Sequence, residues 1–179
     1  ILAAVAALLA APAGAHYHIL LPDRPSAKTD EAVTFTYQFG HPFEHQLFDT
    51  ERPAELYAIF PDGTKSDLSA KMEKVSVDGA DGKKVIGYKF SFTPQKRGDY
   101  TFVAVSSEVK VEGEPLPLRD AAKVVLHVQT QNGWDRKVLG PGTAAVELAP
   151  LSRPYGLTAG AAFQVEADEP ADGDRKPIP

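Results

Sequence analysis

The chain has 179 residues, of which 43% are apolar and 24% charged, with a formal net charge of −5 and no cysteine. This acidic balance excludes the basic surface that nucleic acid or anionic lipid requires, so we expect no nucleic-acid partner. The lack of cysteine excludes disulfides and thiolate zinc sites. A metal site must therefore be built from His, Asp, Glu, backbone groups or a free amine. The length allows one domain and part of another, and because the chain starts at Ile1 and ends at Pro179 we expect a fragment lacking residues at both ends.

The first predicted element is a secretory signal peptide over residues 1–15. Residues 1–11 are uncharged and apolar, and they are too short to span a bilayer, which takes about 20 residues. Small residues then satisfy the cleavage rule twice, so a signal peptidase could cut after Ala13 or after Ala15. We therefore expect export, with a periplasmic mature protein.

Either cut places a histidine third in the mature chain. The third residue is His16 if the chain begins at Gly14, and His18 if it begins at His16. A free amine, two backbone nitrogens and an imidazole can close a square of four nitrogens, which favours Cu(II) or Ni(II). We predict that His16 and His18 are metal ligands. The alternative is a histidine-rich first strand without a special function.

A second histidine cluster follows a predicted strand. Residues 33–39 alternate between apolar and polar side chains, which is typical of a half-buried strand. If residues 42–46 form a short helical turn with proline at its first position, His41 and His45 face the same way. Imidazole with carboxylate suits nickel, cobalt, copper or zinc. The predicted ligands in this stretch are His41, Glu44, His45 and Asp49. The alternative is a solvated loop whose phenylalanines close the end of the fold.

Further strands are expected at the spacing of an antiparallel Ig-like β-sandwich. They cover residues 18–22, 55–60, 74–77, 85–93, 98–105 and 121–130. On the last of these, His127 lies on the face that points away from the core. It is either a further site histidine or an ordinary surface histidine.

The chain is predicted to be all-β and to divide into four parts. After the signal peptide, residues 16–130 form the metal-binding sandwich, residues 131–143 a linker, and residues 144–179 the beginning of a second, truncated Ig-like β-domain. Strands are expected in that last part over residues 145–148 and 161–167, followed by a polar, turn-rich end.

Several short motifs together resemble a bacterial family of exported proteins described as periplasmic components of cobalt/nickel uptake systems. The motifs are Ala-His-x-His at the cleavage site, Gly40-His-Pro-Phe-Glu after a strand, Asn132-Gly-Trp-Asp, and Arg153-Pro-Tyr-Gly-Leu. The resemblance implies a β-sandwich followed by a second Ig-like domain, working beside a metal-ion importer in the inner membrane. It also implies that His16, His18, His41, Glu44 and His45 are metal ligands.

The predicted function is capture and handover of Ni(II) or Co(II), without catalysis. The sequence contains no nucleophile–base pair, phosphate loop or dinucleotide fingerprint, and no small organic substrate is evident. Three alternatives stay open: a Cu(II) carrier, a copper enzyme with a histidine brace, and a structural Ig-like module. The brace requires cleavage after Ala15 and a second histidine from His41, His45 or His127.

Overall fold

The computed structural model describes residues 16–41, 46–79, 82–108, 117–129, 145–172 and 174–178. Within these ranges the regular structure is β-strand, apart from a 3₁₀ turn at Ser69–Lys71 and a 3₁₀ position at Gly82. The prediction of an all-β fold is therefore confirmed. The predicted signal peptide, and with it both cleavage points, lies outside the described residues. No helix in the described part of the chain is long and apolar enough to cross a membrane.

The first sheet of the sandwich has five strands. Its order is β1 (Tyr17–Pro22), β3 (Val33–His41), β8 (Lys84–Phe92) and β7 (Glu73–Asp78), and all neighbours are antiparallel. The short strand β4 (Gln46–Phe48) pairs with the last residues of β3.

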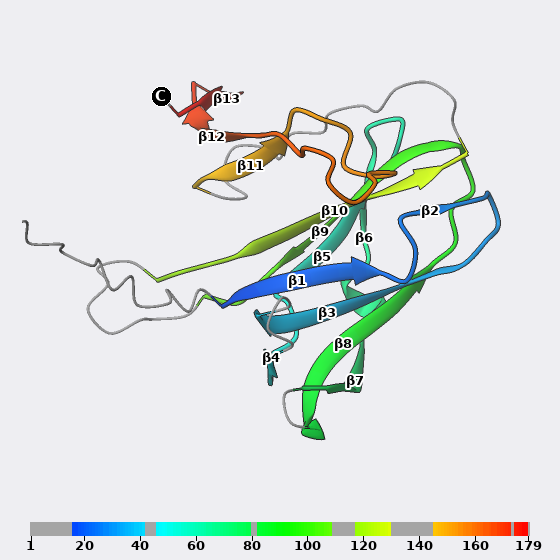
Figure 1. The fold of residues 1–179 in the computed structure, drawn as a ribbon, viewed down its shortest axis with the longest axis vertical. Coiled ribbons are helices and arrows are strands. Elements are labelled where there is room, and N and C mark those ends of the chain that lie inside the picture. The colour runs from blue at the N-terminus through cyan, green and yellow to red at the C-terminus, as the bar shows by residue number, and fades with distance from the viewer. Residues whose placement is uncertain are drawn as a thin grey trace, which may run out of the picture.

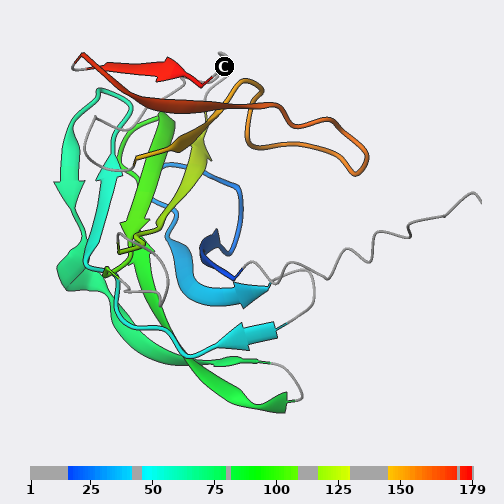
Figure 2. The same ribbon diagram turned by 90° about the vertical axis from the view of Figure 1, so that its left-hand side faces the viewer.

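The second sheet also has five strands and faces the first (Figures 1 and 2). Its order is β2 (Ser26–Ala27), β10 (Ala121–Val128), β9 (Gly98–Val105), β5 (Glu55–Ile59) and β6 (Lys65–Asp67). All pairs are antiparallel except β2 with β10, which is parallel.

The core between the two sheets is aromatic. The ring of Phe35 on β3 stacks on Phe90 at 4.8 Å between centroids and packs against Phe102 of the second sheet at 4.3 Å. The predicted alternation of β3 is observed, because Val33, Phe35 and Tyr37 are fully buried. Each such phenylalanine stabilises the fold by roughly 1.5–3 kcal/mol through its burial.

A third sheet packs against the outer face of β10. It consists of β11 (Glu147–Pro150), β12 (Val165–Ala171) and β13 (Asp174–Pro177) in antiparallel order. In Figure 1 it lies over β10, and the ring of Tyr155 stacks on His127 of β10 at 4.3 Å. The structure thus has strands where residues 145–148 and 161–167 predicted them, shifted by two to four residues. That this sheet begins a second Ig-like domain stays a prediction, and most of the predicted linker lies outside the described residues.

Candidate metal site

The pairing of β1 with β3 brings the first histidine of the described chain to the second histidine cluster. Tyr17 lies opposite Gly40 and His18 opposite Phe39, so His16 continues the register across from His41. The two imidazole rings meet edge to face, with 4.8 Å between centroids and 81° between planes. Residues 25 apart in sequence therefore share one place at the end of the sandwich, as Figure 1 shows for the start of β1 and the end of β3.

His41 is held there by the antiparallel pairing of β3 with β4. Gly40 has φ +146°, and a Cβ atom on it would lie 2.2 Å from the carbonyl oxygen of Gln46, so only glycine permits this approach. Gln46 pairs with His41 as the first residue of β4. This corrects one expectation, because Gln46 is in a strand and not in a helical turn. Gln46 joins β4 because its backbone pairs with His41 across the antiparallel strands. Residues 42–45, including Glu44 and His45, lie outside the described residues.

The Nε2 atom of His41 is buried and has no hydrogen-bond partner among the described residues. An unpaired buried polar atom costs about 1–3 kcal/mol, so native structures seldom contain one without a reason. The ring of His16 beside it is flanked by Phe48 at 4.8 Å and Phe39 at 5.9 Å. Two imidazoles in a partly apolar setting, one with a nitrogen that no described residue bonds, fit a borderline divalent ion such as Ni(II), Co(II), Cu(II) or Zn(II).

Of the two histidines, His16 lines a groove of about 480 Å³, and His41 reaches it only through its contact with His16. One side is contributed by β1 and β3, including His16, His18 and Phe39, and the other by segments next to the second sheet, including Arg52 and Asp120. The groove therefore lies between the two sheets, where the core ends.

His18 lies in the same groove but is bonded differently. Its Nδ1 lies 3.0 Å from Oδ2 of Asp120, and its ring stacks on Tyr37 with 5.2 Å between centroids and 5° between planes. Its other neighbour is Phe39, at 4.8 Å. Within the described ranges, no group of three His, Asp or Glu side chains lies close enough together to hold a metal ion. His16 and His41 are thus a pair, and His18 belongs to a second cluster.

The structure does not bring the two other described candidates to this pair. Asp49 lines the groove, but its Oδ1 accepts a hydrogen bond from the backbone N–H of Ile86 at 2.7 Å. His127 lies at the far end of β10, roughly 23 Å from Asp120 at 3.3 Å per residue. Its Nδ1 lies 2.8 Å from Oδ1 of Asp99, which holds the ring in the contact with the third sheet.

Two residues of the groove, Asp120 and Tyr37, were not predicted from the sequence as site residues. Asp120 precedes β10 and has no pattern around it that marks a site. Tyr37 was predicted only as a core residue, and its hydroxyl oxygen is buried without a hydrogen-bond partner among the described residues. Burial, together with the negative charge of Asp120, raises the pKa of the Tyr37 hydroxyl above its ordinary value of 10.0. The phenol is therefore neutral.

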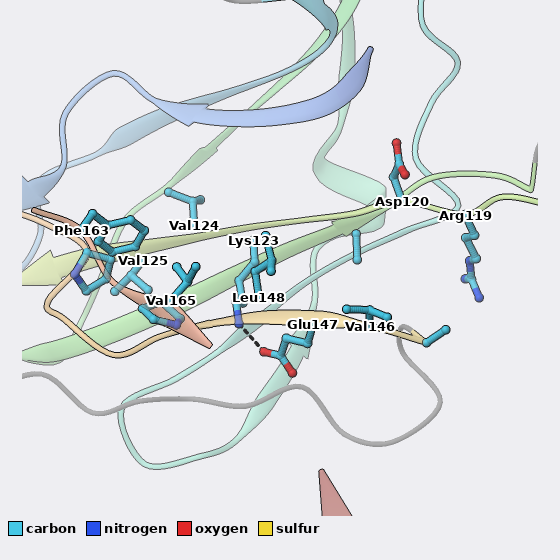
Figure 3. Close-up of a pocket in the computed structure, with 14 residues that line it drawn as sticks. Arg119, Asp120, Lys123, Val124, Val125, Val146, Glu147, Leu148, Phe163 and Val165 are labelled. Atoms are coloured by element: carbon cyan, nitrogen blue, oxygen red, sulfur yellow. Dashed lines mark hydrogen bonds and ion pairs between the residues drawn. The ribbon is translucent and has the colours of Figure 1, made fainter. Parts of the chain in front are cut away.

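A larger cavity of about 680 Å³ lies between β10 and the third sheet (Figure 3). Its lining is mainly apolar, and none of the predicted site residues contributes to it. Figure 3 shows the ion pair of Lys123 with Glu147 at its wall. Glu147 also pairs with Arg175, whose Nε lies 3.2 Å from its Oε2. These charges are used in holding the third sheet on the sandwich.

Fold and site together define a β-sandwich protein with an imidazole-lined groove at one end. The family model for a domain of unknown function, DUF4198, matches residues 13–167, and the chain belongs to this family. The comparison with curated proteins gave no match.

Proposed function

We propose that the protein binds Ni(II) or Co(II) in the periplasm and passes the ion to an importer in the inner membrane. The observation that carries the proposal is the contact of His16 with His41, whose buried Nε2 has no hydrogen-bond partner among the described residues. The resemblance to exported components of cobalt/nickel uptake systems supports the same ions and the same compartment.

The donor set suits capture and release better than permanent retention. Structural metal sites are closed by four protein ligands, whereas two imidazoles leave positions of the ion open for exchange. Imidazole binds metal only when it is unprotonated, so binding releases protons and weakens in acid. We expect Glu44 or His45, next to His41 in the sequence, to supply a further ligand.

Copper is a second candidate, favoured by the place of His16. If the signal peptide is removed after Ala15, His16 becomes the N-terminal residue. Its amine and its ring, together with the ring of His41, then offer three nitrogens to one ion, and tetragonal nitrogen ligation favours Cu(II).

The test uses the untagged protein purified from the periplasm. Intact mass gives the mature N-terminus, and calorimetric titration gives the affinities for Ni(II), Co(II) and Cu(II). We expect His16→Ala and His41→Ala each to lose at least about tenfold in affinity, which is the loss that even an outer-shell residue causes. His127→Gln is the matched control, because it removes a distant histidine and should keep the affinity of the wild type.

Two results would reject the proposal. One is a wild-type protein that binds none of the three ions. The other is unchanged affinity in both His16→Ala and His41→Ala. A tighter complex with Cu(II) than with Ni(II), found together with a mature chain beginning at His16, would favour the copper candidate. Copper-dependent oxidation of ascorbate would then be measured, to distinguish a carrier from an enzyme.

A further inference from the structure

The groove is much larger than a metal ion requires. Its volume is about 480 Å³, whereas an ion with six waters fills on the order of 180 Å³ at about 30 Å³ for each water. Pockets for small organic molecules begin at about 300 Å³. The groove therefore has room for an organic ligand in addition to the ion, beside His16, which lines the groove and contacts His41.

The lining of the groove also presents hydrogen-bond acceptors, from His18 and Asp120. Nδ1 of His18 lies 3.0 Å from Oδ2 of Asp120, and a neutral imidazole that donates to this carboxylate through Nδ1 carries its lone pair on Nε2. The carboxylate of Asp120 is itself 47% exposed, so it can accept further hydrogen bonds. Its backbone is fixed on both sides, because its N–H donates to Oγ of Ser106 and its carbonyl accepts from the N–H of Ser106, both at 2.9 Å. These acceptors are rigidly placed for a ligand that carries N–H groups.

A cation lines the same groove. Arg52 is exposed, and one of its terminal nitrogens donates to the backbone carbonyl of Ser69. A guanidinium has five N–H donors, so the others stay available for a carboxylate. The ring of Phe39 lies between the acceptors and the rim, where it contacts both His16 and His18.

We propose that the groove takes the metal ion as its chelate with an α-amino acid. This inference rests on the proposed function. In such a chelate the amine nitrogen is bound to the metal and keeps two N–H donors, which match Asp120 and His18. The carboxylate binds the metal through one oxygen and keeps the other, which matches Arg52. His16 and His41 bind the open positions of the ion, and the amino-acid side chain packs on Phe39.

The inference is tested by equilibrium dialysis of the untagged protein with nickel, L-histidine, or both together. We expect nickel and L-histidine to be retained in equal amounts, and L-histidine without nickel to be retained poorly. Nickel citrate, which has no N–H donor, should bind at least tenfold more weakly than the nickel–histidine complex. Asp120→Asn and Arg52→Gln should each lower the retention of the complex at least tenfold and leave the affinity for free nickel unchanged. His41→Ala should lower the affinity for both forms.

The control variant is Asp78→Asn, which removes an exposed carboxylate at the edge of the first sheet. Thermal melting of every variant identifies any that fail to fold. When both are present, retention of nickel with no L-histidine beside it, or loss of nickel from the protein to L-histidine, overturns the inference and leaves the proposed function standing. Equal loss in Asp78→Asn and Asp120→Asn also overturns it. A protein that retains nickel in neither form overturns both.

Discussion

Gly40 lets β4 approach β3 closely, and the backbone there sets the position of His41, a predicted metal ligand. With φ at +146° it adopts a conformation that residues with a side chain rarely reach, and it lies directly before His41. In Gly40→Ala the new Cβ atom would lie 2.2 Å from the carbonyl oxygen of Gln46 and 2.9 Å from the Cα of Leu47. Both contacts are with backbone atoms, so no side-chain rotation relieves them. The strand β4 must move away from β3.

The cost to the fold should be moderate. A strained backbone conformation costs about 1–3 kcal/mol, and β4 pairs with only three residues at the end of β3. For a chain of this size, 1 kcal/mol lowers the melting temperature by about 2–4 °C, so we expect a decrease of roughly 2–12 °C. The cost to binding should be larger, because a ligand has to be held within about 0.5 Å of its productive place. We expect the affinity for nickel to fall at least tenfold.

The matched control is Gly63→Ala. Gly63 also has a positive φ, at +83°, but a Cβ atom there would contact nothing within 4 Å. It should lower the melting temperature and leave the affinity for nickel unchanged. Melting is followed by circular dichroism and binding by calorimetry. A Gly40→Ala protein that is folded and binds nickel as the wild type does would show that the pairing of β3 with β4 does not place His41 for the metal.

Two further predictions concern charges away from the groove. Glu147→Gln removes the carboxylate shared by Lys123 and Arg175, whose side chains are only 11% and 2% exposed. The loss should destabilise the third sheet by about 3–5 kcal/mol, because two buried cations lose this partner. Amide hydrogen exchange in β11 and β12 should become faster, and unchanged exchange there would contradict the prediction. Hydrogen bonds from Lys96 and from a neighbouring threonine hold the pKa of Asp62 well below its ordinary 3.8, so its stabilising effect is complete above that pH and is lost as the pH falls towards the folded value. Melting temperatures measured between pH 6 and pH 2 should therefore fall less steeply for Asp62→Asn than for the wild type, and equal slopes would refute the assignment.

The long strands could be predicted because their own residues specify them. Alternation over residues 33–39 marks a strand with one buried face, and the structure buries Val33, Phe35 and Tyr37 as expected. The short strands β2, β4, β6 and β13 were missed, because two to four mostly polar residues carry no period. Such strands form only because a longer neighbour offers its free hydrogen-bonding edge, and that edge is not visible in the local sequence.

The candidate site, like the strands, could be predicted only where neighbouring residues of the sequence specify it. Histidines at the start of one strand and at the end of the next can be recognised as a pair once the strands are taken to be antiparallel. The partner of His18 could not be recognised, because Asp120 is 102 residues away and joins the groove from the other sheet. Its place depends on how the two sheets stack, which no local pattern encodes.

The register of β1 and β3 determines both the core and the site. On β3 the inner face carries Tyr37 within the core and then His41 beyond its end, and on β1 it carries Leu20 within the core and then His16. Successive side chains of a strand point to opposite faces, so a slip of one residue would expose Tyr37 and turn His41 away from His16 at the same time. The apolar burial that selects the register, amounting to several kcal/mol for these side chains, therefore also aligns the imidazoles. The burial that fixes these strands therefore also places the two histidines, and among the described residues of the pair the positive φ falls on Gly40, next to His41.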